Sequence, residues 1–173
     1  ETKDEHGRLM VVHEIDTPKG TLREKTAYPD ADCDTIVEKL IKNFKEDFPK
    51  YKYLLPKVIG YDDTVYQEQK KALGEKGMMG IGVYPPGFQS FISIFNGNIE
   101  ALTYAYYDEP ELFHELCELY EQDQLRKLEM ILEVKPDSVL TGGSGSITLQ
   151  SPEIWDEICL PSIKKITKMC KEA

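Results

Sequence analysis

A loop rich in glycine, serine and threonine has the composition of a binding loop. It reads GGSGSITLQ, from Gly142 to Gln150, and it follows the short apolar run DSVL. Three interpretations are open: the loop holds a phosphate, faces an organic substrate, or is a solvated turn without chemistry. A P-loop requires a lysine after its glycines, and a dinucleotide fingerprint requires a third glycine where Thr148 stands. The pattern therefore favours a substrate-facing loop, with Gly143, Ser144 and Ser146 as candidate binding residues.

A second candidate loop follows the apolar run MMGIGV. Tyr84 comes directly after this run, and Gln89 and Ser90 follow the turn Pro85-Pro86-Gly87. In α/β sheets and barrels, ligands bind beyond the carboxyl ends of the strands, on the loops that lead into the next helix. We therefore expect Tyr84, Gln89 and Ser90 to face a ligand, with packing of Tyr84 against the next helix as the alternative.

One pair of residues has the spacing of metal ligands. His114 and Cys117 lie three residues apart in helical text, so both can face one side of a helix. A metal site needs a third or fourth ligand, and none is evident beside Leu116 and Leu119. The pair is interpreted as structural, and the sequence assigns no metal site, no catalytic residue and no cofactor to this chain.

The elements that position these residues alternate between strands and helices. Two extended runs in residues 1–28 surround the turn Thr17-Pro18-Lys19-Gly20 and predict a β-hairpin. Residues 34–173 read as βα units with a parallel sheet. The predicted helices cover 34–44, 62–77, 88–96, 99–107, 110–134 and 151–173, with a bend at Leu160 before Pro161. The predicted strands cover 54–59, 78–87 and 137–143, the last two buried on both faces.

This rhythm is typical of a doubly wound sheet or of a section of a (β/α)8 barrel. A closed barrel needs eight strands and typically about 250 residues, whereas this chain has 173 residues and three such strands. The chain therefore cannot close a barrel alone, and an open doubly wound sheet and a section of a barrel both remain open. An open section of this kind exposes strand edges and apolar surface, so a second copy or the remainder of a barrel is an expected partner.

Composition excludes several classes of partner. The formal net charge is -10, which disfavours unassisted binding to nucleic acid or to an anionic membrane. No apolar run of 18 residues exists, so a membrane partner is not expected. The four cysteines have no CxxC spacing, and Cys117 and Cys159 lie among apolar helical neighbours. These features predict a reduced, cytoplasmic protein.

Four segments of the chain share a pattern with one known enzyme superfamily. The longest is PDSVLTGGSGSITLQSPEIWDEICLPSIKKITKMC, from Pro136 to Cys170. The others are YYDEPELFHELCELYEQ, GIGVYPPGFQSFISIFNG and the hairpin text DTPKGTL. Together they resemble the uroporphyrinogen decarboxylase superfamily, and the hairpin text is most similar to its methyltransferase-like branch.

The resemblance implies a (β/α)8 barrel of which this chain is a central fragment. Decarboxylases of the superfamily use an aspartate, a tyrosine, a serine and a histidine around a tetrapyrrole. The aspartate segment is expected before Glu1 and the histidine segment after Ala173. Ser93 stands where the resemblance places the tyrosine, and the serine corresponds to Ser144 or Ser146.

The methyltransferase branch resembles the chain more closely. Its members transfer a methyl group between a corrinoid, which a corrinoid protein can carry, and a thiol that zinc holds as thiolate. The zinc ligands, a His-x-Cys and a later cysteine, are expected beyond Ala173. The leading expectation is a fragment of a corrinoid-dependent methyltransferase, inactive by itself. The alternatives are a uroporphyrinogen decarboxylase and a non-catalytic, self-associating binding module.

Overall fold

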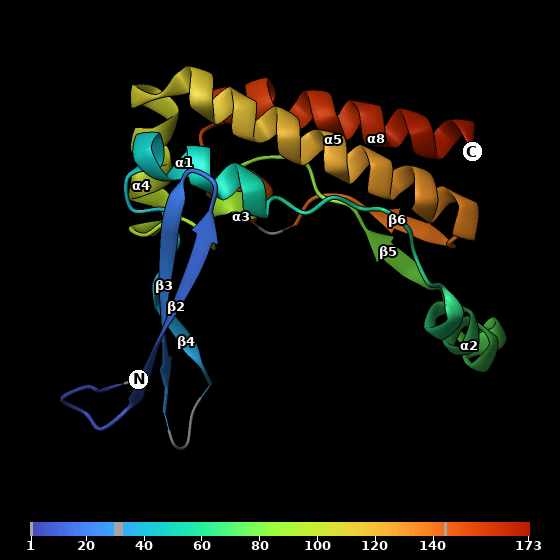
Figure 1. Ribbon diagram of the computed structural model, residues 1–173. Helices are drawn as coiled ribbons and strands as arrows, with labels where there is room; N and C mark the ends of the chain where they lie inside the picture. Colours follow the sequence, from blue (N-terminus) through green and yellow to red (C-terminus); the bar gives the residue numbers. More distant parts are fainter. Residues whose placement is uncertain (1, 30–32, 144) are drawn as a thin grey trace. The chain divides into compact units, whose positions relative to one another are not determined.

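A computed structural model of the chain describes residues 2–29, 33–143 and 145–173 (Figure 1). The chain has a mixed α/β structure and divides into two compact units. Unit 1 contains Glu1–Leu55 and Phe91–His114, and unit 2 contains Pro56–Ser90 and Glu115–Ala173. Within the described residues, no helix combines the length and the apolar character needed to cross a membrane.

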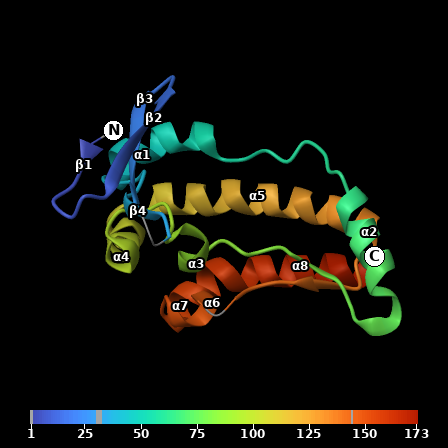
Figure 2. The ribbon, with the colours of Figure 1, turned by 90° about the horizontal axis from the view of Figure 1, so that it is seen from below.

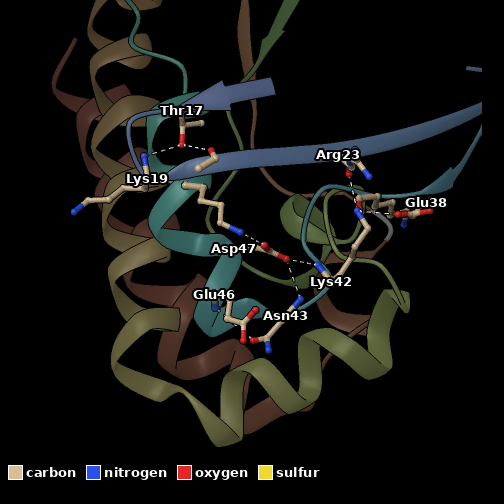
Figure 3. Close-up of polar contacts among 11 residues, drawn as sticks. Thr17, Lys19, Arg23, Glu38, Lys42, Asn43, Glu46 and Asp47 are labelled. Atoms are coloured by element: carbon tan, nitrogen blue, oxygen red, sulfur yellow. Dashed lines mark hydrogen bonds and ion pairs between the residues drawn. The ribbon is translucent and has the colours of Figure 1, made fainter. Parts of the chain in front are cut away.

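Unit 1 contains a four-stranded antiparallel sheet in the order β1-β2-β3-β4, with bounds Thr2–Lys3, Leu9–Thr17, Gly20–Tyr28 and Thr35–Glu38. The predicted hairpin is confirmed, because Thr17 pairs with Gly20 across a two-residue turn. The Thr17 hydroxyl donates to the Gly20 carbonyl at 2.7 Å and accepts from the Lys19 amide at 3.2 Å (Figure 3).

Helix α1 (Phe44–Tyr51) begins at a network of polar contacts around Asp47 (Figure 3). One carboxylate oxygen of Asp47 accepts from the Lys42 and Asn43 amides at 2.9 and 3.0 Å, and the other accepts from Lys50 Nζ at 2.9 Å. Asp47 is 9% exposed, and these hydrogen bonds hold the pKa of its carboxyl below the ordinary value against the effect of burial. The network fixes the entry of the chain into α1.

Aromatic side chains fill the core of unit 1. The ring centroids of Phe44 lie 5.2 Å from Phe48, 5.3 Å from Phe95 and 6.1 Å from Phe113. Helices α3 (Phe88–Phe91) and α4 (Asn98–Asp108) confirm two predicted helices, although α3 is much shorter than the predicted 88–96. The bounds of α4 agree with the predicted 99–107 to within one residue.

Two predictions in residues 34–59 are wrong. No helix spans the predicted 34–44: Thr35–Glu38 forms strand β4, since Ile36 pairs with Thr26 and Thr35 with Ala27 of β3. Three successive β-branched residues fit this pairing better than their four-residue apolar spacing fits a helix. The predicted strand 54–59 is absent from the described residues: η1 (Lys52–Leu54) continues the turn of α1, and no neighbouring strand pairs with the connector.

Unit 2 contains the parallel strands β5 (Gly80–Gly82) and β6 (Ser138–Leu140), with Ile81 opposite Val139. Helix α8 (Leu160–Glu172) runs beside α5 (Pro110–Val134) in both views (Figures 1 and 2). Val83, Leu128, Ile131 and Ile166 form the buried core between strands and helices. Parallel pairing is confirmed, but burial on both faces is wrong: Gly80 and Ser138 are exposed, and Leu140 is 60% exposed.

Helix α2 (Thr64–Leu73) lies within the predicted 62–77 and ends at a glycine. Gly74 has a φ of 53°, which is the left-handed region that glycine adopts without steric cost. A short 3-10 turn, η2 (Gly74–Lys76), follows and leads toward β5.

The segment before α8 contains a π-helical turn. After α6 (Gly145–Thr148), Ser151 caps α7 (Pro152–Ile154) by accepting from the Ile154 amide at 3.3 Å, at the start of the predicted helix 151–173. The chain then forms the π-helical turn η3 (Trp155–Cys159) and enters α8 directly. The second helix predicted from Pro161 onward is α8, which begins one residue earlier at Leu160 and has Pro161 in its first turn.

Candidate functional site

A pocket of about 230 Å³ in unit 2 lies at the carboxyl end of β5. Most of its wall comes from the loop that follows the strand, with further residues from α5 and from the segment before α8. The lining residues are Tyr84, Pro85, Pro86, Gly87, Phe88, Gln89, Ser90, Tyr120, Gln150 and Cys159. None of these ten residues carries a formal charge at neutral pH.

The loop after β5 is held by its own polar groups. The Ser90 hydroxyl donates to the Pro85 carbonyl at 2.8 Å, and the Ser90 amide donates to the Gly87 carbonyl at 3.0 Å. The Tyr84 amide donates to Gln124 Oε1 of α5 at 3.3 Å. Gly87 has a φ of 148°, and a Cβ there would lie 2.7 Å from Cys159 Sγ, so the turn requires glycine.

Gln150 and Cys159 connect this loop to the segment after β6. Gln150 Oε1 accepts from the Phe88 amide at 2.9 Å, and its Nε2 donates to Cys159 Sγ at 2.8 Å. The thiol in turn donates to the Pro86 carbonyl at 3.0 Å. Cys159 is 2% exposed, and burial raises the pKa of its thiol, so it stands as a neutral hydrogen-bonding group.

Tyr120 brings a phenol from α5 to the pocket. Burial raises the pKa of Tyr120, while a hydrogen bond with Ser90 acts in the opposite direction. The phenol is therefore neutral at physiological pH. The pocket as a whole offers hydroxyl, amide and phenol groups among aromatic and proline surfaces, which suits the uncharged part of an organic ligand.

The glycine-rich loop after β6 meets the first loop at Gln89. A Cβ on Gly143 would lie 2.5 Å from Gln89 Nε2, and a Cβ on Gly145 would lie 3.2 Å from Gln89 Cδ. The Gln89 side chain therefore lies close to the backbone of both glycines where the two loops meet. Thr141, at the end of β6, has a buried hydroxyl oxygen that has no hydrogen-bond partner among the described residues.

The predicted binding residues have different positions in the structure. Tyr84, Gln89 and Ser90 line the pocket. Gly143 lies close to Gln89 but is not itself a lining residue, and Ser93 is exposed and lies outside the lining. Ser144 lies outside the described residues, and the side chain of Ser146 does as well.

Sequence reasoning missed Tyr120, Gln150 and Cys159. Tyr120 follows Leu119 in the helix predicted for 110–134, where nothing marks it as a binding residue, and Cys159 was placed among apolar helical neighbours. The signal for Gln150 was a long amide side chain directly before a capping serine. The π-helical turn that carries Cys159 has no sequence signature, although π-helical turns occur frequently at functional sites.

Within residues 2–29, 33–143 and 145–173, no group of three or more His, Cys, Asp or Glu could hold a metal ion. His114 Nδ1 lies 2.7 Å from the Pro110 carbonyl oxygen of its own helix. Cys117 is 5% exposed, and burial raises the pKa of its thiol. A thiol ligates zinc as the thiolate, so this environment opposes metal binding.

Comparison with known proteins gives no assignment: no family model, curated protein or solved structure matches the chain.

Proposed function

We propose that this chain contributes central βα units to a barrel enzyme of the uroporphyrinogen decarboxylase superfamily, one that catalyses corrinoid-dependent methyl transfer to a thiol or a related acceptor. The observation that carries the proposal is the pocket at the carboxyl end of β5, a strand paired in parallel with β6. Barrel enzymes bind their substrates at this end of their strands. The superfamily itself rests on the resemblance of the segments described above.

The pocket fits an edge of a large ring better than the whole ring. Its volume of about 230 Å³ is below the ~300–1,000 Å³ typical of sites that bury a complete drug-sized ligand. A ring substituent that enters the pocket would meet the Ser90 hydroxyl, the Gln89 amide and the Tyr120 phenol. These groups would bind and orient it, and the proline and aromatic surfaces would exclude water.

The absence of charge among the lining residues favours a corrinoid over uroporphyrinogen. The ring of a corrinoid carries neutral amide side chains, which pair well with hydroxyl, phenol and amide groups. Uroporphyrinogen carries carboxylates, and buried carboxylates require cationic or multiple hydrogen-bonding partners. No lysine or arginine lines this pocket within the described residues, which weighs against the decarboxylase alternative.

Zinc chemistry is not assigned to these residues. The described residues offer no group of metal ligands, and the thiols of Cys117 and Cys159 are neutral in their surroundings. The role proposed for this chain is therefore to bind and orient a ligand, and no metal-dependent step is derived from it.

Equilibrium dialysis of the 173-residue chain against hydroxocobalamin, and separately against uroporphyrin III, tests the proposal. We expect retention of hydroxocobalamin and weaker binding by Ser90→Ala. Loss of one hydrogen bond worth about 0.5–1.5 kcal/mol weakens binding by about 2- to 12-fold. Ser93→Ala is the matched control, because Ser93 is exposed and lies outside the pocket lining. Circular dichroism establishes that both variants fold.

Retention of uroporphyrin III with no retention of hydroxocobalamin would support the decarboxylase alternative instead. If neither ligand is retained, or if Ser90→Ala and Ser93→Ala behave alike, the proposed role of the pocket is wrong.

A self-associating module is the second candidate, and one observation favours it. The parallel sheet of unit 2 has two strands in the described residues; Met78, two residues before β5, is 72% exposed, and Leu140, the last residue of β6, is 60% exposed. Exposed apolar residues beside open strand edges promote association. Light scattering over a range of concentrations measures it, and a monomer at all concentrations would exclude this candidate.

A further inference from the structure

A second cavity in unit 2, of about 240 Å³, shares no lining residue with the pocket at the carboxyl end of β5. One wall is a stripe of α5, formed by Lys127, Met130, Ile131 and Val134. Their spacing of three, four and seven residues places them on one face of the helix. The remaining lining residues are Val58, Gly60, Tyr61, Asp62, Asp63, Tyr66 and Ile81.

The connector between η1 and α2 forms the wall opposite α5, and hydrogen bonds hold it there. The Val58 amide donates to Asp123 Oδ1 at 2.9 Å, and the Tyr61 hydroxyl donates to Glu133 Oε2 at 3.2 Å. These two anchors lie on either side of Gly60, so the connector is attached to α5 at both ends of the cavity. The acceptors of both bonds, Asp123 and Glu133, lie outside the lining, and the α5 wall contributes Met130, Ile131 and Val134 as apolar surface.

The residues that line this cavity include two carboxylates, Asp62 and Asp63, and one ammonium group, that of Lys127. Asp62 accepts from the Thr64 amide and hydroxyl at 2.9 and 2.6 Å, and these bonds lower the pKa of its carboxyl. Asp63 Oδ2 accepts from Gln67 Nε2 at 2.9 Å. A carboxylate has about four acceptor sites, so both retain acceptor capacity. Lys127 is the one cation among the lining residues within the described part of the chain.

We propose that this cavity binds a small organic cation, an ammonium group carried on a compact apolar body of one or two rings. A dry apolar cavity of about 150 Å³ holds one benzene molecule, and this cavity is larger by about half. The apolar body lies against the α5 stripe, and the ammonium faces Asp62 and Asp63. The ring of Tyr61, which is 52% exposed, offers the cation a further favourable surface.

This proposal is independent of the proposed methyl transfer, because the two cavities have different lining residues. Three naphthalene compounds with the same ring and linking carbon test it: 1-naphthylmethylamine, 1-naphthalenemethanol and 1-naphthylacetate. Binding to the full chain is measured by naphthalene fluorescence and by saturation-transfer NMR. We expect the amine to bind about two- to fivefold more tightly than the alcohol, which is the worth of a partly exposed charge pair. The carboxylate is expected to bind most weakly.

Two variants locate the site. Val134→Phe fills the cavity from α5 and should abolish binding, whereas Val65→Phe, on an exposed position of α2 outside the lining, should leave it unchanged. Asp63→Asn should reduce the preference for the amine over the alcohol and leave binding of the alcohol unchanged. Because Asp63→Asn keeps the apolar walls intact, it tests the charge even if Val134→Phe fails to fold.

Three outcomes would overturn the proposal. The first is a failure to locate a ligand in the cavity: either none of the three naphthalene compounds binds, or Val134→Phe does not weaken their binding. The second is equal affinity for the amine, the alcohol and the carboxylate, which would remove the role of the aspartates. The third is a dimer in light scattering that Val134→Phe dissociates, since the occupant would then be a second copy of the chain.

Discussion

Replacement of Asp47 tests the polar network at the start of α1. In Asp47→Ala, the amides of Lys42 and Asn43 lose their acceptor, and Lys50 loses its ion pair. An unsatisfied buried donor costs about 1–3 kcal/mol. Both amides are partly buried, so the lower part of that range applies to each. We expect a loss of about 2–3 kcal/mol in the local free energy of unfolding.

Amide hydrogen exchange measured by NMR gives this free energy at the site itself. A loss of 2–3 kcal/mol corresponds to exchange about 30- to 150-fold faster at Lys42 and Asn43. Asp47→Asn retains one carbonyl acceptor and should lose about 1 kcal/mol. Glu46→Ala is the matched control, because Glu46 is exposed and lies in the same turn of α1.

The contribution of Asp47 also depends on pH. Its folded pKa lies below the ordinary value of 3.8, so folding favours the carboxylate. This contribution is complete above that ordinary value and is lost as the pH falls below it, through the lower folded pKa. Exchange at Lys42 should therefore rise more steeply below pH 4 in the native chain than in Asp47→Asn. Equal effects of Asp47→Ala and Glu46→Ala, or equal acid sensitivity of the native chain and Asp47→Asn, would refute this reasoning.

Three further predictions concern unit 2 and the cysteines. Gly87→Ala should lower the free energy of unfolding by about 2 kcal/mol or more, because the φ of 148° and the 2.7 Å distance from a Cβ to Cys159 Sγ both oppose a side chain. Urea unfolding followed by the fluorescence of the single tryptophan measures this, and an unchanged midpoint would contradict it. Ser151→Ala should cost about 1 kcal/mol in the same assay through loss of the α7 cap, and Ser151→Thr, which retains the hydroxyl, should recover most of it. Iodoacetamide at pH 8 should label exposed Cys33 rapidly in the folded chain and Cys117 only after unfolding, since Cys117 is buried and burial raises the pKa of its thiol. Mass spectrometry measures the labelling of each cysteine, and equal labelling in the folded chain would exclude a buried Cys117.

Local signals in the sequence were sufficient for most helices and for the hairpin. Pro110, Gly74 and the Ser151 cap mark helix ends through backbone chemistry that depends on immediate neighbours. The hairpin follows from a two-residue turn between extended runs. The helix predicted for 34–44 was wrong because pairing with β3 determined the conformation of Thr35–Glu38, and that pairing depends on a separate segment of chain.

The candidate site was predicted in part. Tyr84, Gln89 and Ser90 could be chosen because they follow a strand in a loop with clear turn residues, and all three line the pocket. Ser93 follows within three residues but is exposed, because α3 ends at Phe91 and the predicted helix does not continue. Tyr120 could not be chosen from the sequence, since its hydrogen bond with Ser90 joins residues 30 positions apart in the chain.

The sequence by itself determined which loops follow the strands of unit 2 and where its helices begin, because caps, turns and apolar periodicity act over a few residues. The tertiary structure alone decided that Gln150 and Cys159 complete the pocket. Their hydrogen bonds reach Phe88 and Pro86 across 62 and 73 residues of chain, respectively. Such contacts depend on the parallel pairing of β5 with β6 and on the π-helical turn before α8, and no local pattern of residues encodes either.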